Sequence, residues 1–533
     1  MIHRLFRAIE ETPMTVGGWF AGFIGIVFVR IFLENFSGRQ FGVLATSDIE
    51  TILHYTLWYL TGLTAVMTVM HFCIGRDMLR IAKVTLFGAL IIITPPVLDL
   101  IFTQGAGTHM TYVFGAPEML LKNYVTWFFA SPASTGATFG IRIELAILTL
   151  AIFAYARYVG ASLLRSLIAG LLFYTTIFLL GILPNFVGMT GNFGWLLEIQ
   201  HSLLKSSFFR SDQMFSSLTR THDMYSNVAM AQVCTMIVLP LVAFVLFRIV
   251  PEKWKAVMQN ARPERVMHYW VAVTVGIVLA YVEGVGRSLP YGLFDVTTLI
   301  LLYVSFFLVW MFAIAVNDIV DRDSDALTNS TRPLITKALS VSDMRTAAGI
   351  FLGGALVTGF LAGHVAFLTI LVFVAISWIY SSPPLHLKRF VLINASCVAL
   401  ATLSAVVAGF FTVSTEQSFV YFPLAWAVLI FVIITLIGNV KDVKDVAGDR
   451  LAKAYTIPVI FGDKHGRIIV WSLVAFALLL VPFILEDMRL LVPGIIASVC
   501  AYSLIRRNPF RELYLFLLYF VYLASLALIV FLS

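Results

Sequence analysis

The chain has 533 residues, of which 60% are hydrophobic and 12% charged, and its mean hydropathy is +0.93. Soluble domains carry about 25% charged residues, so this composition excludes an ordinary soluble protein. The net charge of +7 does not indicate a nucleic-acid partner, because the basic residues lie between apolar runs, as membrane topology requires, and no RNA-binding motif accompanies them.

Apolar runs of roughly 20 residues, the length that crosses a hydrocarbon core about 30 Å thick, recur along the whole chain. They predict an all-α, polytopic helical membrane protein. The predicted spans of the first half are 15–34, 50–73, 82–104, 138–157, 161–184 and 227–249. Acidic residues and Pro13 separate the basic N-terminus from the first run, so we expect no cleaved signal peptide.

The first half carries no motif that identifies a function, although its layout resembles that of Yip-type membrane domains. The run 195–204 is expected to lie flat at the membrane interface as an amphipathic helix. Asp99 lies in or near a span, where an acidic residue is a functional candidate but can equally mark a helix end. A basic stretch from Arg248 to Arg265 is the predicted boundary between a multi-span domain over 1–250 and a second domain over 255–533.

Nine further spans are predicted in the second half, at 267–284, 294–316, 345–362, 365–380, 392–413, 420–440, 468–485, 489–504 and 512–532. Basic residues concentrate in alternate loops along the chain. The positive-inside rule then places the N-terminus in the cytosol and the C-terminus outside. We expect the membrane to be the cytoplasmic membrane of a bacterium or an archaeon.

One amide and four carboxylates lie within nine residues at 317–325, directly after an apolar run. On a helix, Asn317, Asp321 and Asp325 stand at i, i+4 and i+8, on one face. Like charges at this spacing destabilise a helix, and a bound cation removes the repulsion. Oxygen ligands of this kind suit Mg²⁺. The alternative is a solvated acidic loop at the membrane surface.

A second acidic stretch, at 441–450, also follows an apolar run. There Asp442, Asp445 and Asp449 stand at i, i+3 and i+7, which again is one face of a helix. The predicted topology puts both stretches on the cytosolic side. Two acid clusters in equivalent places indicate the two halves of one site.

The first stretch reads N-D-x-x-D-x-x-x-D and is followed by Arg332-Pro333, and the second reads D-x-x-D-x-x-G-D and is followed by Thr456-Ile457-Pro458. Over roughly residues 255–533 the chain resembles the UbiA superfamily of intramembrane prenyltransferases. The resemblance implies a nine-helix bundle that transfers a prenyl group from a prenyl diphosphate to an aromatic or lipid acceptor, with Mg²⁺. It implies a core Mg²⁺ set of Asn317, Asp321, Asp445 and Asp449, with Asp318, Asp325 and Asp442 in supporting positions.

Other residues are expected to serve the same reaction. Arg332, Lys388 and Arg389 are candidates for binding the diphosphate, although Lys388 and Arg389 can equally act as topology signals alone. Aromatic faces can stabilise a cation-like allylic carbon. Tyr380 is the preferred candidate among the aromatic residues Tyr303, Phe306, Trp310, Phe312 and Trp378. With Asp321 and Asp445 it forms the predicted catalytic set.

Two other functions compete with the enzyme: an ion-coupled transporter and a non-catalytic, lipid-binding membrane scaffold. Transporters place ion ligands at broken helices near the membrane midplane. Here the acids follow the spans, which favours the enzyme. Every carboxylate of both motifs is present, which argues against an inactive scaffold. The expected partners are therefore a prenyl diphosphate, an aromatic or lipid acceptor and membrane lipids, without nucleic acid.

Overall fold

The structure is a computed structural model that describes residues 2–39, 48–102, 112–113, 117–126, 137–188, 221–288, 292–444, 446–451 and 454–531. All secondary-structure elements assigned in these ranges are helices. Fifteen of the described helical segments are long and apolar enough to cross a membrane. Six of these end by Ile249, and the other nine begin from Pro263 onwards. The predicted all-α membrane fold, with six spans followed by nine, is confirmed.

The chain forms two compact units. The first comprises Met1–Trp254 with Pro290–Thr297, and the second comprises Lys255–Leu289 with Thr298–Ser533. The change of unit after Trp254 falls inside the basic stretch between Arg248 and Arg265. That the two units are separate functional domains remains a prediction.

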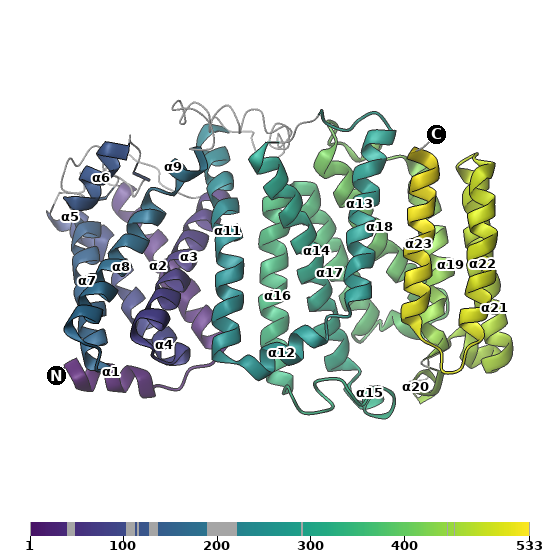
Figure 1. The fold of residues 1–533 in the computed structure, drawn as a ribbon, viewed down its shortest axis with the longest axis horizontal. Helices are drawn as coiled ribbons and strands as arrows, with labels where there is room; N and C mark the ends of the chain where they lie inside the picture. The colour runs from purple at the N-terminus through teal and green to yellow at the C-terminus, as the bar shows by residue number, and fades with distance from the viewer. Residues whose placement is uncertain are drawn as a thin grey trace. The chain divides into compact units, whose positions relative to one another are not determined.

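The first unit is a bundle of helices (Figure 1). Its helices are α1 Ile2–Glu11, α2 Val16–Arg39, α3 Ile49–Ile74, α4 Met78–Ala89, η1 Leu90–Ile93, α5 Thr94–Phe102, α6 Pro117–Val125, α7 Phe139–Tyr158, α8 Leu163–Gly181, α9 Leu183–Gly188 and α11 Thr221–Ile249. Several begin at N-caps whose side chains accept a backbone N–H three residues on, as Thr138 and Ser162 do.

Two acidic residues of this unit have structural partners. Glu10 fixes α1 against the bundle, because its carboxylate accepts from Arg76 at 2.5 Å and from the Tyr155 hydroxyl at 2.8 Å. Asp99 Oδ1 accepts from the backbone N–H of Gly140 at 2.7 Å, in the first turn of α7. Asp99 was expected either to be a functional acid within the membrane or to mark a helix end, and this contact favours the helix end. The predicted amphipathic run 195–204 lies outside the described residues.

The second unit begins within helix α12 Pro251–Gln259. Its other helices are α13 Pro263–Val282, α14 Leu293–Val320, α15 Arg322–Thr328, α16 Val341–Ala362, α17 His364–Ser381, η3 Leu387–Arg389, α18 Ile393–Val413, η4 Phe419–Tyr421, α19 Leu424–Ile437, η5 Gly438–Val443, α20 Val446–Leu451, α21 Ile457–Ile484, η6 Met488–Leu490, α22 Leu491–Arg506 and α23 Glu512–Phe531.

Helix α18 is the core of the second unit, packing against α13, α17 and α19. Two glycines let α13 and α18 cross in backbone contact. A Cβ atom on Gly276 would lie 1.9 Å from the Val406 carbonyl oxygen, and one on Gly409 would lie 2.1 Å from the Val273 carbonyl oxygen. Small residues permit this close approach of membrane helices. The short helices α15 and α20 contact each other at one end of the bundle, and α23 finishes at the opposite end (Figure 1).

Candidate active site

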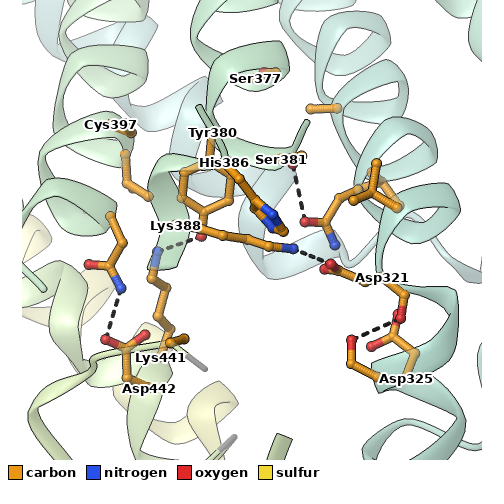
Figure 2. A pocket seen from close by; sticks show the side chains of 18 of the residues that line it. Asp321, Asp325, Ser377, Tyr380, Ser381, His386, Lys388, Cys397, Lys441 and Asp442 are labelled. Atoms are coloured by element: carbon orange, nitrogen blue, oxygen red, sulfur yellow. Dashed lines mark hydrogen bonds and ion pairs between the residues drawn. The ribbon is translucent and has the colours of Figure 1, made fainter. Parts of the chain in front are cut away.

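A cavity of about 570 Å³ opens in the second unit, lined by residues of both short helices α15 and α20. Helices α13, α14, α17 and α18, the segment η5 and the loop after α17 complete its wall. The predicted residues that line it are Asn317, Asp321, Asp325, Arg332, Tyr380, Lys388, Arg389, Asp442 and Asp449. Figure 2 shows side chains of this set facing a common open space. The two acidic stretches, more than a hundred positions apart in the sequence, therefore contribute to one wall.

The first acidic stretch runs from the last turn of α14 into α15. The backbone N–H of Asp321 donates to the carbonyl of Asn317, and that of Asp325 donates to the carbonyl of Asp321, both at 2.8 Å. The helix is nevertheless interrupted here, because α14 ends at Val320 and Asp321 caps the start of α15. The expected single helix is therefore wrong in detail, but the side chains of Asn317, Asp321 and Asp325 all line the cavity. Asn317 Oδ1 also accepts from the Ser381 hydroxyl at 3.2 Å.

Asp318 is placed differently from the other acids of this stretch. Its side chain is 1% exposed and does not line the cavity. It accepts from Asn260 at 2.7 Å, from Arg262 at 3.1 Å and from Arg332 at 3.0 Å. These contacts tie the start of α13 and the loop after α15 to the end of α14. In the arrangement described, Asp318 holds basic residues in place.

Arg332 bridges two acids, since it also pairs with Asp325. The Asp325 carboxylate accepts a further hydrogen bond from Asn329 at 3.0 Å. Burial raises the pKa of Asp325 above its ordinary value, and the positive charge of Arg332 opposes the rise. The residue that follows the first motif in sequence is thus fixed beside it in space.

The segment between α17 and α18 supplies two of the predicted basic residues, Lys388 and Arg389. Lys388 pairs with Asp321 across the cavity (Figure 2). The backbone carbonyl of Arg389 accepts from the N–H of Tyr455 at 2.8 Å, which joins this loop to the segment that follows the second motif. Burial and the charges of Lys388 and Arg389 together lower the pKa of His386, whose ring lines the same cavity.

The second acidic stretch does not form the single α-helix expected from its spacing. Helix α19 ends at Ile437, a 3₁₀ segment η5 follows, and α20 begins at Val446. The reason is local. The Asn439 amide donates to the carbonyls of Thr435 at 2.8 Å and Leu436 at 3.2 Å, in the last turn of α19. Asn side chains commonly compete with the helix in this way.

Both described acids of this stretch nevertheless line the cavity. Asp442 accepts from the Asn394 amide at 3.0 Å, and Asp449 accepts from the Thr456 hydroxyl at 3.1 Å. Asp445 lies outside the described residues. In the part of the chain that the structure describes, no three His, Cys, Asp or Glu side chains are close enough together to hold a metal ion. The predicted Mg²⁺ set therefore remains a prediction.

The predicted Tyr380 has a charged neighbour. Lys441 donates to its hydroxyl at 2.9 Å, and the Lys441 ammonium lies 4.9 Å from the centre of its ring. One face of this ring is therefore already occupied by a cation.

Part of the cavity wall is aromatic, and it includes residues about two turns before Asn317 on α14 and before Tyr380 on α17. Tyr269 lies next to Trp310, with ring centres 5.5 Å apart, and next to Phe373, at 4.9 Å. Of the six aromatic residues considered from the sequence, Trp310 and Tyr380 line the cavity and the other four do not. Tyr269 and Phe373 were missed, because nothing in the local sequence distinguishes them from other aromatic residues of the spans.

Sequence reasoning also missed four basic residues of the wall, Arg262, Arg265, Lys441 and Lys444. Arg265 pairs with Glu512, the first residue of α23, and Lys444 donates to the same carboxylate at 2.6 Å. Arg265 and Glu512 are 247 positions apart. Only the fold brings them together, so the sequence holds no local signal for this contact.

Residues 270–514 match the model of the UbiA prenyltransferase family. A homogentisate phytyltransferase from Synechocystis is 26% identical over 160 residues, which cover 29% of this chain and 52% of that protein. A chloroplastic chlorophyll synthase from Arabidopsis thaliana is 31% identical over 164 residues, which cover 28% of this chain and 41% of that protein. The chain thus spans about half or less of the length of these relatives. A UbiA homolog from Archaeoglobus fulgidus, solved with DMAPP and Mg²⁺, matches 50% of this chain and 96% of its own, with 22% identity and a TM-score of 0.41.

Proposed function

Residues 270–514 of this chain belong to the UbiA prenyltransferase family, and from this premise we propose that the chain transfers a prenyl group from a prenyl diphosphate to an aromatic or lipid acceptor within the membrane. One observation carries the proposal. One cavity among the candidate membrane spans is lined both by acids and basic residues and by a group of aromatic rings. A prenyl diphosphate has the same division between a polyanionic head and an apolar chain.

The polar end suits a diphosphate. We propose that Arg332, Lys388 and Arg389 bind it, because Arg contacts phosphate through two parallel N–H groups and Lys supplies a point charge. Arg332 is paired with Asp325, and Lys388 is paired with Asp321. A bound diphosphate would therefore compete with these carboxylates for basic side chains that are already in position. Neutralisation also explains how clustered carboxylates are stable at a membrane surface.

The donor set fits Mg²⁺, which prefers carboxylate and amide oxygens and phosphate. We propose that Asn317, Asp321 and Asp449, all on the cavity wall, hold the metal together with Asp445. Asp325 and Asp442 support them from the same wall, while Asp318 acts through Arg332. When bound, Mg²⁺ neutralises charge on the departing diphosphate.

Transfer breaks the bond between the prenyl C1 and its diphosphate oxygen, and the electron pair leaves with the diphosphate. The acceptor then forms a bond to C1 and gives up a proton. We propose that Tyr269, Trp310 and Phe373 face the cation-like carbon, since each aromatic face stabilises a cation by roughly 0.5–2 kcal/mol. The predicted catalytic role of Tyr380 then becomes one of orienting Lys441.

We also propose the orientation in the membrane. Basic residues are frequent at the end of the bundle where α15 and α20 lie. Examples are Arg322, Lys388, Lys444 and Arg450. The positive-inside rule places this end in the cytosol, where water-soluble diphosphate is released.

The test is direct. Purified full-length protein in nanodiscs is given labelled prenyl diphosphates of several chain lengths, a panel of aromatic and lipid acceptors, and Mg²⁺, and the products are identified by mass spectrometry. We expect a prenylated acceptor from the wild type and from Asp463→Asn, whose side chain is 60% exposed and does not line the cavity. Asp321→Asn should yield none. The proposal fails if no pair of donor and acceptor reacts, or if Asp321→Asn is as active as the wild type.

A further inference from the structure

The first unit encloses a cavity of its own, of about 520 Å³. It lies among α1, α3, α4, α7 and α8, so membrane spans form most of its wall. Its volume is within the range of about 300–1,000 Å³ typical of small-molecule sites. The wall is almost wholly apolar, and among the described residues that line it there is no Lys, Arg or His.

One carboxyl group interrupts this apolar wall. Glu144, in α7, is 9% exposed and lines the cavity. It forms no hydrogen bond or ion pair with any residue that the structure describes. Ionisable residues inside a membrane are costly, and they commonly mark sites of function.

Arg30, whose positive charge acts on Glu144, has other hydrogen-bond partners. Arg30 attracts Glu144 electrostatically, but its guanidinium donates to the Glu34 carboxylate at 3.3 Å and to the Ile92 carbonyl at 3.0 Å. One guanidinium thus serves two buried carboxyl groups. Ionisation of both would leave an uncompensated negative charge in an apolar interior, so one carboxyl is more stable in the neutral form.

A neutral carboxyl group both donates and accepts a hydrogen bond. Its complement in an apolar cavity is a hydroxyl or carbonyl group at the end of a hydrocarbon chain. A phosphate head group finds no cation in the described lining, and it would face Glu144 instead. A buried polar group without a partner is destabilising, so a ligand that supplies the partner gains affinity from it.

We propose that the first unit binds one neutral lipid, mostly hydrocarbon, whose single hydroxyl or carbonyl group is hydrogen-bonded to Glu144. The site is separate from the candidate active site, and the inference does not depend on the proposed transfer reaction. Another part of the wall is tied to α1, because Tyr155, on the same helix as Glu144, lines the cavity and donates to Glu10 at 2.8 Å.

Three photoreactive probes with the same chain test this: hexadecanol, hexadecylamine and hexadecyl phosphate, each carrying a diazirine. A saturated chain avoids confusion with the prenyl donor of the second unit. The full-length protein in nanodiscs is irradiated with each probe, and the labelled peptides are mapped by mass spectrometry. We expect saturable labelling of α3, α4 and α7 by the alcohol, at least tenfold stronger than by the amine or the phosphate.

Variants locate the polar contact. Glu144→Leu should lower labelling by the alcohol about tenfold, while Glu144→Gln, which keeps a donor and an acceptor, should stay within about threefold of the wild type. Leu148→Trp, which fills the cavity, should abolish labelling, whereas Leu167→Trp, at an exposed position of the same unit, should not.

Three outcomes overturn the proposal. Equal labelling by all three probes means that bulk lipid fills an unselective groove. Preference for the amine means that Glu144 binds a cation. Unchanged labelling of Glu144→Leu, with Leu148→Trp folded and still labelled, means that the alcohol binds elsewhere.

Discussion

At the scale of single residues, three acids of the first stretch are paired with basic residues. Asp321 has Lys388, Asp325 has Arg332, and Asp318 has both Arg262 and Arg332. Charges that would repel one another as a group are thus stabilised in pairs. The acids and two of these basic residues could be predicted from the sequence, because metal and phosphate binding restrict the residue types that can serve. Arg262 could not, since its contact with Asp318 depends on the fold.

His386 gives this region a pH dependence. Its folded pKa is lowered by burial and by Lys388 and Arg389, so below its ordinary pKa of 6.5 the unfolded state binds more protons than the folded state. Stability from this group is therefore complete above 6.5 and is lost as the pH falls below that value. We expect the drop in melting temperature between pH 7.5 and 5.5 to be smaller in His386→Gln than in the wild type. An equal drop in both proteins would contradict this account of the imidazole.

At the scale of elements, local pattern predicted the first acidic stretch and failed for the second. In the first, the chain changes from α14 to α15 at Asp321, but hydrogen bonds between residues four apart continue across the change, and the three predicted side chains all line the cavity. In the second, the Asn439 side chain donates hydrogen bonds to backbone carbonyls in the last turn of α19, and a 3₁₀ segment follows. The pattern of apolar residues carries no information on whether a side chain competes with the backbone for hydrogen bonds.

The crossing of α13 and α18 depends on glycine. Gly409→Ala would place a methyl group about 2 Å from a carbonyl oxygen, so the helices must separate. We expect a loss of roughly 1–3 kcal/mol, as for other overpacked cores, measured as a lower midpoint of thermal unfolding. Gly349→Ala, in α16, is the matched control, because its new Cβ meets nothing within 4 Å. Equal midpoints for the two variants would show that the crossing tolerates a wider spacing.

Glu512 connects α23 with the site. It holds Arg265 and Lys444, both of which line the cavity. In Glu512→Gln these basic residues are free to pair with the site acids, so we expect kcat/KM for prenyl transfer to fall about tenfold, in line with the loss of about 1.4 kcal/mol. Asp463→Asn breaks an exposed pair with Arg467 in α21 and should leave kcat/KM unchanged. If Glu512→Gln matches this control, the ion pairs only anchor the helix.

At the scale of the whole molecule, the sequence predicted the number and positions of the spans because apolar length alone sets them. It could not predict which spans meet. The crossing at Gly276 and Gly409, and the aromatic wall around Tyr269, depend on contacts between residues far apart in the chain. The family match covers residues 270–514. In the first half, no sequence motif identified a function.

A chain that begins at Pro251 retains both acidic stretches and all nine later spans. We expect it to be produced in detergent as a folded protein and to bind a non-hydrolysable prenyl thiodiphosphate in the presence of Mg²⁺, within a few-fold of the affinity of the full chain. Calorimetry on both proteins provides the comparison. Binding by the full chain alone would show that the first half contributes to the site.

The central claim is that the two acidic stretches form one Mg²⁺–diphosphate site, with Asp321 and Asp449 on the same cavity wall. The most direct measurement is Mg²⁺-dependent diphosphate release by Asp321→Asn, Asp449→Asn and the double variant, beside Asp463→Asn, which lies outside the cavity lining, as control. Residues that act as a unit give strongly non-additive losses. We therefore predict that each single variant loses nearly all turnover and that the double variant is scarcely worse than either, while the control keeps wild-type release. Wild-type turnover in either single variant, or losses that multiply in the double variant, would contradict a shared site.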